Sequence, residues 1–151
     1  MLLLCLVASA ALSQAPLIPR ELLLGAPERT NPRISPDGKQ LSWLAPDAKG
    51  VLQVWVRPLS GQDKDAVALT NDQQRPVVVY EWAQDPGYVL YRQDSGGDEN
   101  FHLFSVELAT MNVRDLTPFL GVRMNSWETR AKCPDTVLAS LNLRDRKVFD
   151  Q

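Results

Sequence analysis

The amino-acid sequence predicts an all-β protein in which one four-stranded unit is repeated. Short runs of alternating apolar and polar residues are separated by turns, and eleven prolines and eight glycines are spread through the 151 residues. A turn containing Pro and Asp recurs at Asp37, Asp85 and Asp135, at intervals of about 48 residues. Four short strands at this period are typical of β-propeller blades. The sequence therefore predicts a partial β-propeller of about two and a half blades.

Composition is that of a globular protein and narrows the classes of partner. Hydrophobic residues make up 44% and charged residues 23% of the chain, with a net charge of −2. The densest basic stretch is Arg144-Asp145-Arg146-Lys147, which an aspartate interrupts. A nucleic-acid or anionic-membrane surface needs a larger excess of positive charge. We therefore expect neither as a partner.

Residues 1–15 resemble a secretory signal peptide. Met1 to Leu12 is a short apolar run, and Ala8-Ser9-Ala10 fits a cleavage position, although no Lys or Arg precedes the run. The run is too short to span a bilayer, which takes about 20 apolar residues. We expect export to the periplasm or the medium, with no membrane contact after cleavage. A buried N-terminal strand or a misplaced start codon are the alternatives.

Residues 16–30 form a leading segment, and residues 31–73 form the first unit. Glu21 to Leu24 is expected to make one helical turn that ends at Gly25. In the turn Ser35–Gly38, Pro36 presets φ and Gly38 supplies a positive φ. Further strands of this unit are expected at Gln40–Ala45, Val51–Leu59 and Ala66–Leu69.

Residues 74–121 form the second unit, and residues 122–151 an incomplete third. In the second unit, the turn Gln84–Gly87 takes the place of Ser35–Gly38. Its strands are expected at Val77–Trp82, Tyr88–Gln93 and Phe101–Leu108. The third unit is expected to turn at Cys133-Pro134-Asp135 and to continue as the strand Thr136–Leu141.

The number of units falls short of a closed propeller. Propellers close with about four to eight blades, and an isolated blade leaves an apolar face uncovered. We therefore expect the sequence to be the N-terminal portion of a longer protein.

Several stretches in order resemble the propeller of exported peptidases of the prolyl-oligopeptidase superfamily. They are LIPRE from Leu17, ISPDGKQLSWLAPD from Ile34, VLQVWVR from Val51, DSGGDENFHLF from Asp94, RDLTPF from Arg114 and LNLRDR from Leu141. The resemblance covers nearly all of the chain after residue 15 and is closest to dipeptidyl and acylaminoacyl peptidases. The SPDG turn alone is less specific, since TolB-like and WD40-like propellers also carry such blades.

The resemblance implies a propeller that covers a separate α/β-hydrolase domain carrying Ser, Asp and His. No Gly-x-Ser-x-Gly nucleophile motif occurs in this sequence, so no catalytic residue is assigned. His102 is expected to be a strand histidine beside Phe101 and Phe104. Dipeptidyl peptidases of this superfamily hold the substrate amine with a pair of acidic propeller residues. This sequence has no adjacent Glu-Glu, so that selectivity is not carried over.

The densest acidic cluster provides the candidate contact site. Asp94, Asp98, Glu99 and Asn100 lie on one glycine-containing loop between two expected strands. Oxygen ligands at this spacing suit Ca²⁺ or a cationic peptide end, but the order of an EF-hand is missing. A solvated loop held by its own hydrogen bonds is the simpler interpretation, and contact with a neighbouring domain or with substrate is a third. No metal or cofactor is expected.

The aromatic residues are expected to fill the space between blades rather than to bind sugar or peptide ligands. They are Trp43, Trp55, Trp82, Trp127, Tyr80, Tyr88 and Tyr91.

Together these observations predict the gating and substrate-selecting propeller of a secreted serine peptidase that acts on short peptides. The peptide would be cleaved by a hydrolase domain outside this sequence. The alternative is a TolB-like propeller that binds protein partners without catalysis. Peptide preference and oligomeric state stay open.

Overall fold

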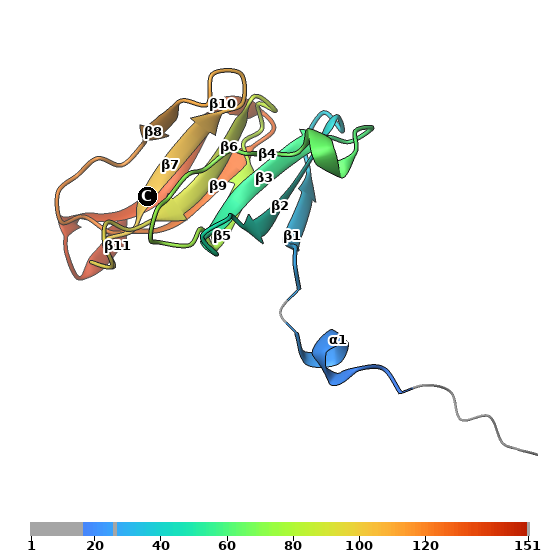
Figure 1. The fold of residues 1–151 in the computed structure, drawn as a ribbon. Helices are drawn as coiled ribbons and strands as arrows, with labels where there is room; N and C mark the ends of the chain where they lie inside the picture. The colour runs from blue at the N-terminus through green and yellow to red at the C-terminus, as the bar shows by residue number, and fades with distance from the viewer. Residues whose placement is uncertain (1–16, 26, 151) are drawn as a thin grey trace, which may run out of the picture.

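The computed structural model describes residues 17–25 and 27–150. The signal-peptide prediction for residues 1–15 lies outside these ranges. Helix α1, Arg20–Leu24, ends at Gly25, whose N–H donates to the Glu21 carbonyl at 2.8 Å. The predicted helical turn is therefore confirmed. α1 buries no residue and stands apart from the sheets (Figure 1). Within the described ranges, no helix has the length and apolar character to cross a membrane.

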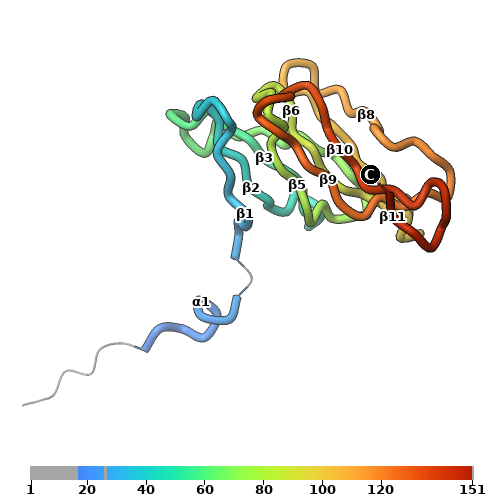
Figure 2. The backbone as a smooth tube through the Cα atoms, turned by 180° about the vertical axis from the view of Figure 1, so that it is seen from behind, coloured from blue at the N-terminus to red at the C-terminus, as the bar shows by residue number. Residues whose placement is uncertain are grey.

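The strands form three antiparallel sheets that follow one another along the chain. The first sheet has the order β1-β2-β3-β4, the second β5-β6-β7-β8, and the third β11-β10-β9. Each sheet is a meander, because strands adjacent in sequence pair with each other. In Figures 1 and 2 the second sheet lies between the other two. The strands are β1 Thr30–Ile34, β2 Gln40–Pro46, β3 Leu52–Pro58, β4 Val67–Ala68, β5 Val79–Trp82, β6 Tyr88–Gln93, β7 His102–Glu107, β8 Val113–Asp115, β9 Met124–Arg130, β10 Cys133–Asp145 and β11 Val148–Asp150, with a short 3-10 helix η1 at Asp63–Asp65. The predicted all-β class and its repeated sheets are confirmed.

The first turn has the predicted conformation. Gly38 has a φ of 72° and donates to the Ser35 carbonyl at 2.9 Å. The Asp37 carboxylate accepts hydrogen bonds from the Ser35 hydroxyl at 2.6 Å and from the Lys39 N–H at 3.1 Å. The Ser35 hydroxyl in turn accepts from the Gln40 N–H at 2.9 Å. Each side chain of the turn thus satisfies a backbone group that the strands leave free.

The second turn has the predicted position and a different interior. Ala83 donates to the Tyr88 carbonyl, just as Ser35 donates to the Gln40 carbonyl, so Gln84–Gly87 takes the place of the first turn. Here the hydrogen bond that closes the turn runs from the Tyr88 N–H to the Asp85 carbonyl at 3.2 Å. Gly87 does not have a positive φ, in contrast to Gly38. Moving Pro to the third position of the loop shifts the tight turn by one residue.

The predicted turn at Cys133-Pro134-Asp135 is wrong. β9 and β10 are joined at Ala131-Lys132, and Cys133 already pairs with Arg130. The register then shifts between Cys133 and Val137, and Pro134, which has no N–H to donate, is tolerated at such an irregular strand end. β10 also continues to Asp145, beyond the predicted end at Leu141.

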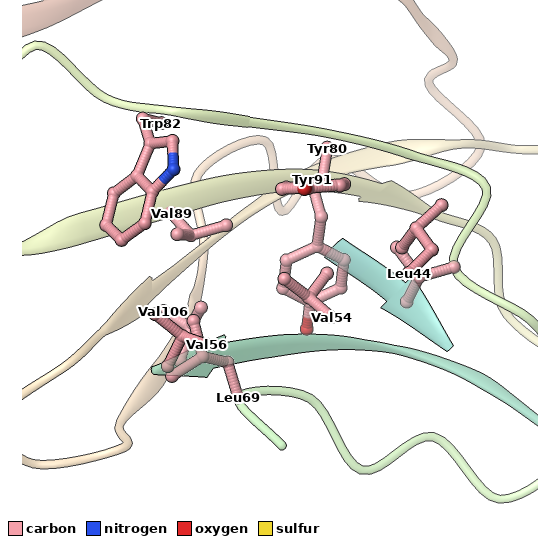
Figure 3. Packing of buried hydrophobic residues seen from close by; sticks show 10 residues of the cluster. Leu44, Val54, Val56, Leu69, Tyr80, Trp82, Val89, Tyr91 and Val106 are labelled. Carbon is pink, nitrogen blue, oxygen red and sulfur yellow. The ribbon is translucent and has the colours of Figure 1, made fainter. Parts of the chain in front are cut away.

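The core consists of two layers of side chains between neighbouring sheets. In β6, Val89 and Tyr91 face the first sheet, whereas Leu90 packs with Met124 of the third. Figure 3 shows the layer between the first and second sheets. Full burial of each such side chain contributes roughly 1.5–3 kcal/mol. This layer contains Leu44, Val54, Val56, Leu69, Val77, Tyr80, Trp82, Val89, Tyr91 and Val106.

Most of the aromatic residues fill the space between sheets, as predicted. Tyr80, Trp82 and Tyr91 belong to the first layer, and Trp127 packs against the second. Trp43 is buried on the other face of the first sheet, where the Arg29 guanidinium lies 5.0 Å from its ring centroid. Trp55 pairs with Trp43 across β2 and β3, and Tyr88 is 36% exposed. The prediction is therefore wrong for Trp43, Trp55 and Tyr88.

One buried hydroxyl connects the first two sheets. The Tyr80 hydroxyl donates to the Asn31 carbonyl at 2.6 Å and lies 3.1 Å from the Ser42 hydroxyl. Asn31 has a φ of 51°, a conformation that few residues other than glycine adopt readily. Tyr80 therefore satisfies a carbonyl at a backbone position that deviates from the regular strand.

Gly38→Val is expected to destabilise the fold by about 1–2 kcal/mol, since a β-branched residue is strained at positive φ. No atom lies within 4 Å of an added Cβ at Gly38, so the loss is conformational rather than steric. Chemical denaturation measures it. Gly38→Asn is the matched control, because Asn tolerates this conformation, and an equal loss in both variants would contradict the assignment.

Tyr80→Phe is expected to cost about 1–3 kcal/mol, since it leaves the Asn31 carbonyl without its donor. Tyr88→Phe, at an exposed position of β6, serves as the control and should change the unfolding free energy little. Equal unfolding midpoints for the two variants would show that the hydroxyl bridge contributes nothing.

Candidate binding site between the first two sheets

A cavity of about 780 Å³ lies where three connections meet. In an antiparallel meander the β4–β5 connection, the β6–β7 loop and the segment after β8 all lie at the same end of the sheets. The cavity is lined by residues 71–75 from the first, residues 94–96, 98 and 100 from the second and Leu120-Gly121 from the third. Strands β6, β7 and β8 supply its remaining wall. Ligand sites commonly have volumes of about 300–1,000 Å³.

Asp94 attaches the β6–β7 loop to the β4–β5 connection. Arg75 donates to both of its carboxylate oxygens, from Nε at 2.9 Å and from Nη2 at 3.1 Å. The Asp94 side chain is 0% exposed. Burial by itself disfavours the charged carboxylate, but the Arg75 hydrogen bonds and the Glu99 N–H outweigh it, so the pKa of Asp94 is lowered. Asp94 is therefore an ionised, fully paired residue.

Asp98 shapes the tip of the same loop. Its carboxylate accepts hydrogen bonds from the Asn100 side chain at 3.1 Å, the Asn100 N–H at 3.0 Å and the Ser95 N–H at 3.3 Å. These bonds, with that of Asn100 first, lower the pKa of Asp98. Glu99 is exposed with a φ of 59° and is not among the residues that line the cavity. Three of the four predicted site residues thus line one cavity.

Asp72 holds the opposite wall. Its Oδ1 accepts from the N–H groups of Gln74 at 2.9 Å and Arg75 at 2.6 Å. Gln53 of β3 donates to the Asp72 carbonyl at 2.8 Å, and Gln93 of β6 donates to the Arg75 carbonyl at 2.8 Å. Two buried glutamines, one from each sheet, therefore hold the β4–β5 connection in place.

The wall formed by the second sheet is aromatic. Tyr91 pairs with Phe104 across β6 and β7, and their rings stack at 5.3 Å between centroids. His102 follows on the same face, with its ring centroid 6.3 Å from that of Phe104. Its Nδ1 lies 2.7 Å from the Asp115 carboxylate at the end of β8. The prediction of a strand histidine beside Phe104 is confirmed.

The Tyr91 hydroxyl lies in this acidic setting. Burial first, and then the nearby charges of Asp72 and Asp115, raises the pKa of Tyr91 to about 12. The hydroxyl therefore stays protonated at physiological pH. The cavity combines carboxylates, amides and a phenol on a rigid frame, and this chemistry suits recognition of a ligand. Within residues 17–25 and 27–150, no group of three His, Cys, Asp or Glu side chains is arranged to hold a metal ion.

Stacked, meandering sheets with an apolar layer between each neighbouring pair define the β-propeller class. The chain matches no protein-family profile. It superimposes on a TolB protein from Agrobacterium tumefaciens (17% identity, TM-score 0.55, 78% of this chain and 39% of that one). It also superimposes on puromycin hydrolase (19% identity, TM-score 0.54, 82% and 22%). At identities this low, the similarity establishes the fold alone. It confirms the prediction of a propeller.

Sequence similarity connects the chain to particular proteins. It is 45% identical over 134 residues to dipeptidyl aminopeptidase BIII of Pseudoxanthomonas mexicana, covering 89% of this chain and 19% of that protein. It is 33% identical over 93 residues to dipeptidyl peptidase family member 6 of Caenorhabditis elegans, and the match covers 62% of this chain and 12% of that protein. The chain is thus a homologue of dipeptidyl aminopeptidase BIII and spans about a fifth of its length. The resemblance to a peptidase propeller is confirmed.

Sequence reasoning missed the residues that complete the cavity, namely Asp72, Arg75, Tyr91, His102 and Asp115. They come from separate strands and connections. The repeat itself contains a usable signal, because a four-stranded meander brings the end of its fourth strand beside the loop between its second and third strands.

Stability is expected to fall in acid partly through Asp94. Because its pKa is lower in the folded state, its ionisation stabilises the fold above the unfolded pKa of about 4, and that contribution is lost as pH falls through the folded pKa. Asp94→Asn should therefore flatten the decline in unfolding free energy between about pH 5 and pH 2. Asp135→Asn, at an exposed position, is the control. An unchanged acid limb in Asp94→Asn would contradict the assignment.

Proposed function

We propose that this chain is the propeller portion of an exported serine peptidase that acts on short peptides, and that it gates and selects substrate without cleaving it. The observation that carries this proposal is the 45% identity to dipeptidyl aminopeptidase BIII over 89% of the chain. The absence of a Gly-x-Ser-x-Gly motif from the sequence agrees with a non-catalytic role for this part.

The cavity supports a selecting role. It opens at the connection end of the first two sheets, where three chain segments converge on a rigid frame. Loops at one end of a propeller are positioned to contact whatever covers that end. In the proposed enzyme this is a hydrolase domain, and cleavage there proceeds through an acyl-enzyme formed on a serine. Asp94, Asp98 and Asn100 are the members of the predicted cluster that line the cavity.

Export is part of the proposal and is supported by the apolar run Met1–Leu12, followed by small residues. The second candidate is a TolB-like propeller that binds proteins. The structural similarity to TolB, with a TM-score of 0.55, supports this candidate through the shared fold.

The test is to express the complete reading frame that contains this sequence and to assay the purified product on dipeptidyl and acylaminoacyl chromogenic substrates. We expect turnover that a serine-directed inhibitor abolishes, and export of a reporter fused after residue 15. The chain of 151 residues alone should give no turnover. A full product without peptidase activity would overturn the enzymatic proposal and favour the protein-binding propeller.

A further inference from the structure

One mostly buried side chain in the cavity has a hydroxyl without a protein partner. Tyr91 is 7% exposed, its side chain lines the cavity, and its hydroxyl forms no hydrogen bond with any described residue. Tyr80, buried in the same layer (Figure 3), uses its hydroxyl to connect two strands. The Tyr91 hydroxyl oxygen is not among the fully buried side-chain atoms that lack a partner, so it is open to the cavity. The hydroxyl of Tyr91 is therefore available to a ligand.

The charges around this hydroxyl favour a cation. Four aspartates line the cavity, namely Asp72, Asp94, Asp98 and Asp115, against one arginine and one histidine. Arg75 forms an ion pair with Asp94, and His102 contacts Asp115. Asp72 and Asp98 form no ion pair with any described residue and accept only N–H groups. Two of the carboxylates that line the cavity are therefore free to pair with a cation.

The aromatic wall is suited to the apolar part of the same ligand. Phe104 lies between Tyr91 and His102 in a stacked row along β6 and β7. Long basic side chains place their methylene groups along apolar surfaces while the charged end reaches polar groups. An aromatic surface beside carboxylates also attracts a guanidinium or ammonium group.

We propose that this cavity is a subsite for the basic side chain of a peptide, lysine or arginine, whose charged end lies between Asp72 and Asp98 and donates to the Tyr91 hydroxyl. That the ligand is a peptide rests on the proposed function; that it is a cation rests on the cavity alone. The phenol accepts the hydrogen bond, and the carboxylates supply the charge. An anionic ligand is disfavoured, because four aspartates line the cavity.

Isothermal titration calorimetry on the purified full-length protein, expressed from its complete reading frame, tests the proposal. The probes are Nα-acetyl-arginine amide and Nα-acetyl-lysine amide, with Nα-acetyl-norleucine amide as the uncharged analogue. Acetylation removes the α-ammonium group, so binding reports on the side chain. We expect the basic probes to bind at least about tenfold more tightly than norleucine, and salt to weaken them.

Matched variants locate the site. Tyr91→Phe and Asp72→Asn should each weaken the basic probes about tenfold. Tyr80→Phe and Asp135→Asn should leave binding unchanged, since neither residue lines the cavity. The two tyrosine variants should therefore have different effects. Tyr80→Phe should lower stability, whereas Tyr91→Phe should lower affinity for the basic probes.

Equal affinity for Nα-acetyl-norleucine amide and Nα-acetyl-arginine amide would overturn the proposal, and so would undiminished binding of the basic probes in Tyr91→Phe. A third contrary result would be binding of glycine amide, which has a free α-ammonium group, when the acetylated probes do not bind. Calorimetry requires no hydrolysis. Failure of this proposal is therefore distinguishable from failure of the proposed peptidase function.

Discussion

The structure depends on the burial of both faces of the second sheet. In a strand, successive side chains point to opposite faces. Val89 and Tyr91 of β6 therefore contact the first sheet, while Leu90 between them contacts the third. Neither layer forms unless the neighbouring sheet is in place, so the sheets stabilise each other as adjacent repeats do in stacked repeat proteins. The connections that carry the candidate site are held at fixed positions because the sheets that they join are packed against each other.

Polar contacts then fix how the sheets meet at each end. The Tyr80 hydroxyl joins β5 to the Asn31 backbone, and Gln53 and Gln93 hold the β4–β5 connection from the first and second sheets. Arg75 and Asp94 extend this order to the β6–β7 loop. The start of the loop is therefore tied to the β4–β5 connection, and a selective site requires such fixed supporting contacts.

The sequence was sufficient for most strands of the first two sheets and their order, because alternation and turn chemistry are local properties. β6 has the predicted bounds, and Gly38 has the predicted positive φ. The position of the β9–β10 turn was not predictable from Pro134 alone, since the register shift that accommodates it depends on the pairing with β9. The candidate site was predicted as a loop of four residues. Its other half, including Tyr91 and Asp72, is brought together only by the packing of two sheets.

One border strand in each of the first two sheets is very short, with two residues in β4 and three in β8. A strand at the border of a sheet offers unpaired N–H and C=O groups to other chains, and this is a common route to aggregation. At β4 and β8 few such groups are available, and the charged Arg114 interrupts the second of these borders. At the β4 and β8 borders, the shortness of the strand thus limits pairing with strands of other molecules.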